Sequence, residues 1–176
     1  MTEYSPRLFT TDAEIEHLGE GLLACTATRD EWTHEAHLAA TTYLLLRRPD
    51  IDLDEELPGI IRRFNESVGG TNSDTEGYHE TITRCSLHGV RIFLERADLR
   101  APLHEIVNRL LLAPMGRRDW PLRFFSRERL FSVEARLSHV APDLAPMPSA
   151  QRLGLERGYE RARAGLPTTV ASSGTS

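Results

Sequence analysis

The residues best suited to chemistry in this sequence are histidines, and two of them lie close together. His34 and His37 are three positions apart in the segment WTHEAHL, residues 32–38. Residues three apart on a helix are surface neighbours, with about 5–6 Å between their Cβ atoms. The two imidazoles can therefore bind one ion from the same helix face, and imidazole is a good ligand for zinc, iron, nickel and copper.

A third histidine, His79, follows a long polar loop and begins a helix in the segment GYHET. The small side chains of Thr83 and Ser86 continue its face and leave room for an ion or a small ligand. A His-x-x-His pair alone is more often solvated than metal-bound, but a third imidazole completes a site with open coordination positions, which a catalytic metal requires. We therefore predict a divalent metal ion, iron or zinc, bound by His34, His37 and His79.

Other polar residues are candidates for catalysis or for substrate binding. Glu80 is the nearest candidate acid/base, although on a helix it points about 100° away from the histidine before it. Glu134 is the second candidate, because a carboxylate among apolar helix positions needs a partner. Asn65 and Asn72 belong to a long polar loop that would cover the site, where they either orient a ligand or form the turns. Arg127 lies in a basic, aromatic segment and could bind a substrate carboxylate or phosphate, although a connector pinned to the core is the better interpretation of that segment.

Together these residues predict a small metal-dependent enzyme that acts on a small molecule, by hydrolysis or group transfer with zinc and by oxidation with iron. A di-iron oxygenase-like bundle is one alternative, because such bundles use Glu-x-x-His on two helices. That spacing occurs here at Glu14–His17, Glu31–His34 and Glu76–His79. A second alternative is a non-catalytic helical protein that binds a small ligand through Arg84, Arg91 or Arg127. A third is a structural partner of another protein.

One further pair, Cys85 and His88, has the spacing of a nucleophile and a base on a helix. Packing is the better interpretation of a cysteine on an apolar helix face. Whether His88 or Glu134 joins the metal site stays open, because a sequence defines helix boundaries only to within one or two residues.

The elements that must position these residues are helices. Apolar periodicity, capping residues and prolines predict an all-α domain with about four to five main helices packed as a bundle. The expected helices cover residues 12–25, 30–48, 54–64 (or from 57, because of Pro58), 78–96, 102–112 and 126–141, with a polar helix at 151–164. We expect one domain over residues 1–164 and a disordered tail over 165–176.

Composition narrows the possible classes of protein. The 176 residues are 40% hydrophobic and 27% charged, which is typical of a globular domain. The net charge of −5 argues against a general nucleic-acid-binding protein, and the absence of lysine excludes Schiff-base chemistry by a lysine. No apolar run suits a signal or a membrane span, and Cys25 and Cys85 form no paired motif. We therefore expect a cytoplasmic protein with reduced cysteines.

The segments WTHEAHL (residues 32–38) and GYHETIT (residues 77–83) resemble those of a family of uncharacterised bacterial proteins. The stretch from Phe124 through Arg136 to Leu144 is similar as well. The resemblance covers most of residues 32–144 and implies a bacterial source, but it brings no established activity. A broader likeness to helical bundles with three histidine ligands rests on residue types alone.

Overall fold

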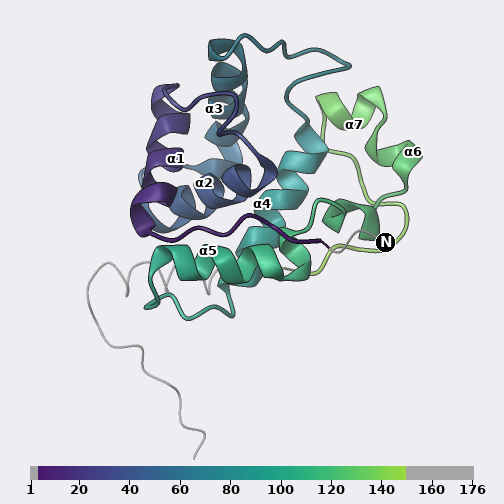
Figure 1. Ribbon diagram of the computed structural model, residues 1–176. Helices are drawn as coiled ribbons and strands as arrows, with labels where there is room; N and C mark the ends of the chain where they lie inside the picture. Colours follow the sequence, from purple (N-terminus) through teal and green to yellow (C-terminus); the bar gives the residue numbers. More distant parts are fainter. Residues whose placement is uncertain (1–3, 150–176) are drawn as a thin grey trace, which may run out of the picture.

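The computed structural model describes residues 4–149, where all the regular secondary structure is helical and there is no β-strand. Figure 1 shows α1, α2 and α3 gathered on one side, α4 through the middle, α5 along the base, and α6 and α7 on the other side. The prediction of an all-α bundle with about five main helices is confirmed. The main helices are α1 (Asp12–Ala24), α2 (His34–Arg47), α3 (Leu53–Ser67), α4 (Glu80–Leu94) and α5 (Leu103–Leu112). The shorter elements are η1 (Pro114–Gly116), η2 (Trp120–Arg123), α6 (Arg127–Leu130) and α7 (Val133–Leu137).

Side-chain caps set the beginnings of most helices. Thr11 and Glu14 form a capping box at α1, and the Ser126 hydroxyl accepts a hydrogen bond from an amide of α6, so both predicted starts are confirmed. The predicted start at Asp30 is wrong, because the Thr33 hydroxyl accepts the Ala36 amide and α2 begins at His34. The pocket-forming histidine pair therefore lies in the first turn of α2.

Helix α3 begins earlier than the proline suggested and continues through it. Pro58 lies inside the helix and has no N–H for the carbonyl of Asp54 four residues before it. The Arg84 guanidinium donates to that carbonyl instead, at 2.5 Å. A side chain from α4 thus replaces the hydrogen bond that proline removes, which a sequence read one helix at a time cannot reveal.

The single helix predicted over residues 126–141 is wrong, since the structure has two short helices, α6 and α7, separated at Phe131 and Ser132. The Ser132 hydroxyl donates to the Arg129 carbonyl, which ends α6, and accepts the Ala135 amide, which begins α7. The break turns Glu134 outward, to 68% side-chain exposure. Its predicted place on the apolar face is therefore wrong.

Two apolar clusters hold the fold together, and α4 belongs to both. Leu87, Val90 and Leu94 join the large core of α1, α2, α3 and α5. Cys85 faces the smaller cluster formed by η2, α6, α7 and the segment after them, which includes Trp120 and Phe125. The two clusters leave a hollow between α2 and α3 on one side and α4, α6 and α7 on the other.

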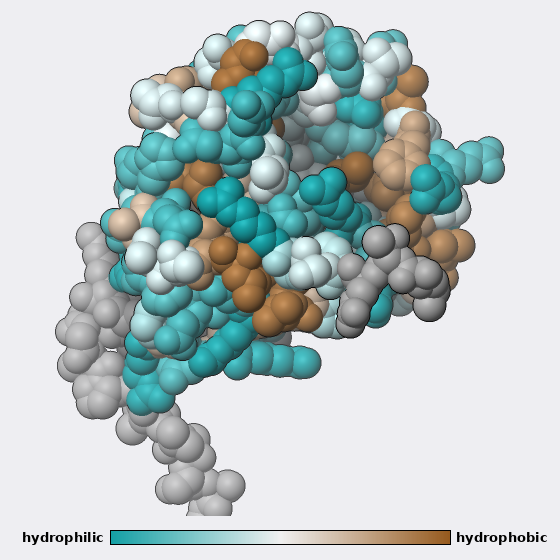
Figure 2. Space-filling model, in the orientation of Figure 1, coloured by the Kyte–Doolittle hydropathy of each residue, from teal (hydrophilic) through white to brown (hydrophobic). Residues whose placement is uncertain are grey.

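Apolar atoms reach the surface on the side of α6 and α7 (Figure 2), where Phe131, Val133 and Leu137 are at least half exposed. Among the helices that the structure describes, none is long and apolar enough to cross a membrane. The helix predicted over residues 151–164 and the tail predicted over 165–176 lie outside the described residues.

Candidate functional site

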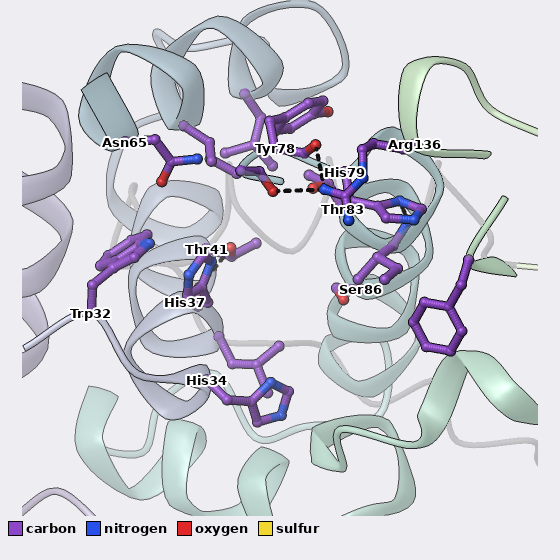
Figure 3. A pocket seen from close by; sticks show the side chains of 16 residues that line it. Trp32, His34, His37, Thr41, Asn65, Tyr78, His79, Thr83, Ser86 and Arg136 are labelled. Atoms are coloured by element: carbon purple, nitrogen blue, oxygen red, sulfur yellow. Dashed lines mark hydrogen bonds between the residues drawn. The ribbon is translucent and has the colours of Figure 1, made fainter. Parts of the chain in front are cut away.

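The three predicted histidines line one pocket, with a cavity volume of about 480 Å³, which is within the usual range for small-molecule sites. Helices α2, α3, α4 and α7 all contribute to its wall, together with Trp32 before α2 and the end of the long loop. Figure 3 shows Trp32 and Asn65 on one side, Arg136, Thr83 and Ser86 on the other, and His37 between them. The lining residues are Trp32, His34, His37, Leu38, Thr41, Leu57, Ile61, Asn65, Gly77, Tyr78, His79, Ile82, Thr83, Ser86, Phe131 and Arg136.

His37 is the histidine of this pocket whose ring is free to react. Neither of its ring nitrogens has a hydrogen-bond partner among residues 4–149. The indole of Trp32 packs against the ring, with 4.2 Å between the centroids, and fixes its position. Burial lowers the pKa of His37 to about 4, and the positive charge of Arg118, with that of His34 when His34 is protonated, acts in the same direction. At neutral pH the ring is therefore uncharged and offers a lone pair.

His34, one turn before His37, is held by the backbone of η1. Its Nε2 lies 2.8 Å from the carbonyl oxygen of Gly116, so Nε2 carries the proton and Nδ1 is left as the acceptor. Burial lowers the pKa of His34 and keeps the ring neutral at physiological pH. A backbone carbonyl behind one ring nitrogen is how proteins orient histidines whose other nitrogen binds a metal.

His79 uses both ring nitrogens inside the protein. Nδ1 accepts the Ile82 amide at 3.3 Å and caps α4, and Nε2 lies 2.9 Å from the Leu130 carbonyl at the end of α6. Burial lowers the pKa of the ring, as does the nearby Arg136. His79 thus joins α4 to α6, and metal binding by either nitrogen would have to break one of these hydrogen bonds.

The predicted metal site is not tested by this arrangement. Within residues 4–149 no group of three or more histidine, cysteine or carboxylate side chains is placed to hold a metal ion. The pocket lining contains no aspartate or glutamate, and the guanidinium of Arg136 lies in its wall. The three-histidine site stays a prediction, with His34 and His37 as the two residues that have a lone pair to give.

Glu80, the predicted acid/base, lies beside the pocket and not in its lining. Its carboxylate accepts the Tyr78 hydroxyl at 2.8 Å and Nε of Arg84 at 2.7 Å. Burial alone would raise the pKa of Glu80, but these two hydrogen bonds outweigh burial and lower it. A carboxylate so engaged is a positioning group for Tyr78 rather than a free base.

An arginine that the sequence analysis did not single out, Arg136, reaches the pocket from α7. Its Nη1 donates to the carbonyls of Gly77 and Tyr78, at 3.1 and 3.2 Å (dashed lines in Figure 3). Gly77 takes a left-handed conformation, φ 78°, and an added Cβ would lie 2.1 Å from the Thr71 carbonyl oxygen, so glycine is required there. The predicted substrate residue Arg127 instead lies over the ring of Phe131, exposed and outside the lining.

The two asparagines that the sequence could not separate have different roles. Asn65, near the end of α3, lines the pocket, and its amide donates to Asn72 at 3.1 Å. Asn72 lies outside the lining and organises the loop, since its oxygen also accepts the Tyr78 amide and its nitrogen donates to the Arg62 carbonyl. Asn72 therefore builds the turns and places Asn65 and Tyr78 at the pocket wall.

The remaining candidates lie away from the pocket. Cys85 is buried, which raises the pKa of its thiol to about 12 and makes it a packing residue. The His88 ring bonds the Pro148 carbonyl, and Arg84 and Arg91 both bind Asp54. Of the three glutamates in the di-iron alternative none lines the pocket; they are Glu14, Glu31 and Glu76.

Comparison with known proteins adds no functional information, because no family model, no curated protein and no solved structure matches this chain. The resemblance to an uncharacterised bacterial family is therefore untested. The pocket residues are the remaining guide to function.

Proposed function

We propose that this protein is an enzyme that acts on a small molecule in the central pocket, and that His37 is its catalytic residue. One observation carries the proposal: His37 is a neutral imidazole in the wall of the pocket, and no described residue hydrogen-bonds to its ring. A ring nitrogen that no protein group engages is free to hydrogen-bond a molecule that enters the pocket. Such a group is typical of functional sites, where the partner arrives with the substrate.

The chemistry that this ring supports best is proton transfer. A free nitrogen of His37 takes a proton from the substrate and returns it to the product, while Trp32 holds the plane of the ring. The empty-pocket pKa of about 4 makes His37 a weak base before substrate binds. A negatively charged substrate offsets the nearby positive charges and raises the pKa of His37 toward the working pH, so that binding itself activates the base.

A metal-dependent form of the same enzyme is the second candidate, and the geometry of His34 favours it. Its Nε2–H is fixed on the Gly116 carbonyl, which leaves Nδ1 as the nitrogen able to bind an ion, and His37 is three residues along the same helix. One zinc or iron ion on these two nitrogens would leave several coordination positions for water and substrate. The absence of a carboxylate among the lining residues and the presence of Arg136 weigh against a tightly bound cation.

The proposal is tested by following the conversion of a mixture of small metabolites by mass spectrometry with the purified protein. The matched variants are His37→Gln, which keeps polarity but removes the basic nitrogen, and His139→Gln at an exposed position. We expect at least one compound to be consumed by the parent and by His139→Gln but not by His37→Gln. Elemental analysis of the parent and of His34→Ala then separates the two forms, because only the metal-dependent enzyme contains stoichiometric metal that His34→Ala loses.

A compound that binds and is returned unchanged by all three proteins would contradict the enzyme proposal and favour a binding protein. Conversion at equal rates by the parent and by His37→Gln would contradict the role of His37.

A further inference from the structure

One edge of the Arg136 guanidinium, formed by Nε and Nη2, has no partner among residues 4–149. The Nη1 atom of this arginine donates to the Gly77 and Tyr78 carbonyls, which pins the guanidinium against the end of the loop. Its Nε and Nη2 have no hydrogen-bond partner, and its guanidinium has no ion-pair partner, among residues 4–149. Five N–H donors in a rigid plane make such a vacant edge a strong binding site for an anion.

The same edge binds carboxylates elsewhere in this chain. Arg48, Arg100 and Arg117 each use Nε and Nη2 to hold the two oxygens of an aspartate two residues away, at 2.9 to 3.2 Å. Those three pairs are local and largely exposed. Arg136 presents the same two atoms in the wall of a cavity and has no aspartate beside it in the sequence.

The charged side chains in and near the pocket lining also favour an anionic ligand. No carboxylate is among the lining residues, and that of Glu80, which follows His79 in the chain, is already held by Arg84 and Tyr78. The positive charge of Arg118 is close enough to lower the pKa values of both His34 and His37. A single negative charge entering this space therefore meets the positive charges of Arg136 and Arg118, and the opposing charge that acts on His34 is the carboxylate of Glu35.

The other residues of the pocket lining indicate what kind of ligand fits. Apolar side chains from α2, α3, α4 and the α6–α7 break surround the cavity: Leu38, Leu57, Ile61, Ile82 and Phe131. Besides the histidines, Asn65 and Tyr78, the polar groups of the wall include the hydroxyls of Thr41, Thr83 and Ser86. One arginine edge with mostly apolar walls suits one carboxylate on an apolar body, whereas a doubly charged phosphate would need a second cation in the lining.

We propose that the pocket binds small molecules with a single carboxylate, which Nε and Nη2 of Arg136 hold side-on while the apolar body lies between Ile61, Ile82 and Phe131. This inference rests on the proposed function and names its substrate class. It also assigns Arg136 as the residue that determines specificity, with His37 left free to act on the body of the ligand.

The test measures binding of phenylacetate by calorimetry, with phenylacetamide and phenyl phosphate as the neutral and the doubly charged probes of similar shape. The variants are Arg136→Gln, Arg136→Lys and, as the matched control, Arg127→Gln on the exposed start of α6. We expect phenylacetate to bind the parent and Arg127→Gln equally and Arg136→Gln at least tenfold more weakly, with Arg136→Lys between them. Phenylacetamide should bind the parent as weakly as phenylacetate binds Arg136→Gln.

Equal binding of phenylacetate and phenylacetamide would overturn the proposal, and so would phenyl phosphate binding more tightly than phenylacetate through Arg136. Because Arg136 also holds the Gly77 and Tyr78 carbonyls, circular dichroism first confirms that each variant is folded. As a second readout, chemical-shift changes in the folded parent should centre on Arg136 and Ile82. His37→Gln separates the two proposals: it keeps phenylacetate binding if the carboxylate site is right, whether or not His37 is catalytic.

Discussion

The polar groups on the two sides of helix α4 differ in whether the protein supplies their hydrogen-bond or ion-pair partners. On the face toward α3, Arg84 and Arg91 bind Asp54, and Arg84 also binds Glu80, so each of these charges has a partner. Across the pocket from the other face, three groups of neighbouring elements have no partner within residues 4–149. They are the ring of His37 on α2, one edge of the Arg136 guanidinium on α7 and the buried indole N–H of Trp32. The first face stabilises the fold, whereas the second retains an energetic cost that a ligand can remove.

The difference teaches that charge type alone does not mark a functional residue in this chain. Arginines occur on both faces, and the sequence favoured Arg84 and Arg91 over Arg136. What distinguishes them is whether the protein itself supplies the partner. Substitutions on each side of α4 therefore have different expected effects on the free energy of unfolding.

The largest effect should come from acid acting on His37. Its pKa is about 4 in the folded protein and about 6.5 in an unfolded chain. Between these values the unfolded state binds more protons, so the contribution of His37 to stability is fully present above pH 6.5 and is lost as the pH falls toward 4. The loss is at most about 3 kcal/mol, and burial lowers the pKa values of His34 and His79 in the same direction.

Urea unfolding of the parent and of His37→Leu at pH 8, 6, 5 and 4 measures this effect. At pH 8 the variant should equal the parent or exceed its free energy of unfolding by up to about 1 kcal/mol, because leucine removes a polar group without a partner. At pH 4 the advantage of His37→Leu should be about 3 kcal/mol larger than at pH 8. Parallel pH profiles for the two proteins would show that His37 is not held neutral.

The next effect concerns the paired face. Asp54→Ala removes the carboxylate that holds Nη1 and Nη2 of Arg91 at 2.8 and 3.0 Å, with both side chains less than a third exposed. We expect the free energy of unfolding to fall by about 2 kcal/mol, after allowing for solvent screening. Asp119→Ala, which breaks the exposed pair with Arg117, is the control and should cost less than about 1 kcal/mol. Equal losses in the free energy of unfolding for the two variants would mean that the Asp54–Arg91 ion pair stabilises the fold no more than an exposed ion pair does.

The smallest effect compares two hydroxyls on α4. Thr81 is fully buried, donates to the Ser138 carbonyl and accepts the Val140 amide, so Thr81→Val should cost about 1–2 kcal/mol. Ser86 lies in the pocket wall, and Ser86→Ala should leave stability unchanged or raise it by about 0.5 kcal/mol through helix propensity. Thermal unfolding of both variants measures the difference. A larger loss in Ser86→Ala than in Thr81→Val would contradict the assignment of the two faces.

Much of the secondary structure could be predicted because its causes are local. Thr11 and Ser126 begin helices through hydrogen bonds within four residues. The errors arose where a distant group intervened. Helix α3 continues through Pro58 because Arg84 from α4 takes the freed carbonyl, and no spacing within α3 predicts that.

The sequence by itself determined that His34 and His37 lie on one helix face, since helix periodicity depends on neighbours along the chain, whereas the packing of the helices brings His79 into the same pocket. Only the tertiary structure decided what each histidine does there. Carbonyls 82 and 51 residues away engage His34 and His79, while no described residue engages His37. The physical reason is that a hydrogen-bond partner is fixed by distance in space, so the availability of a lone pair is a property of the packed molecule and not of a motif.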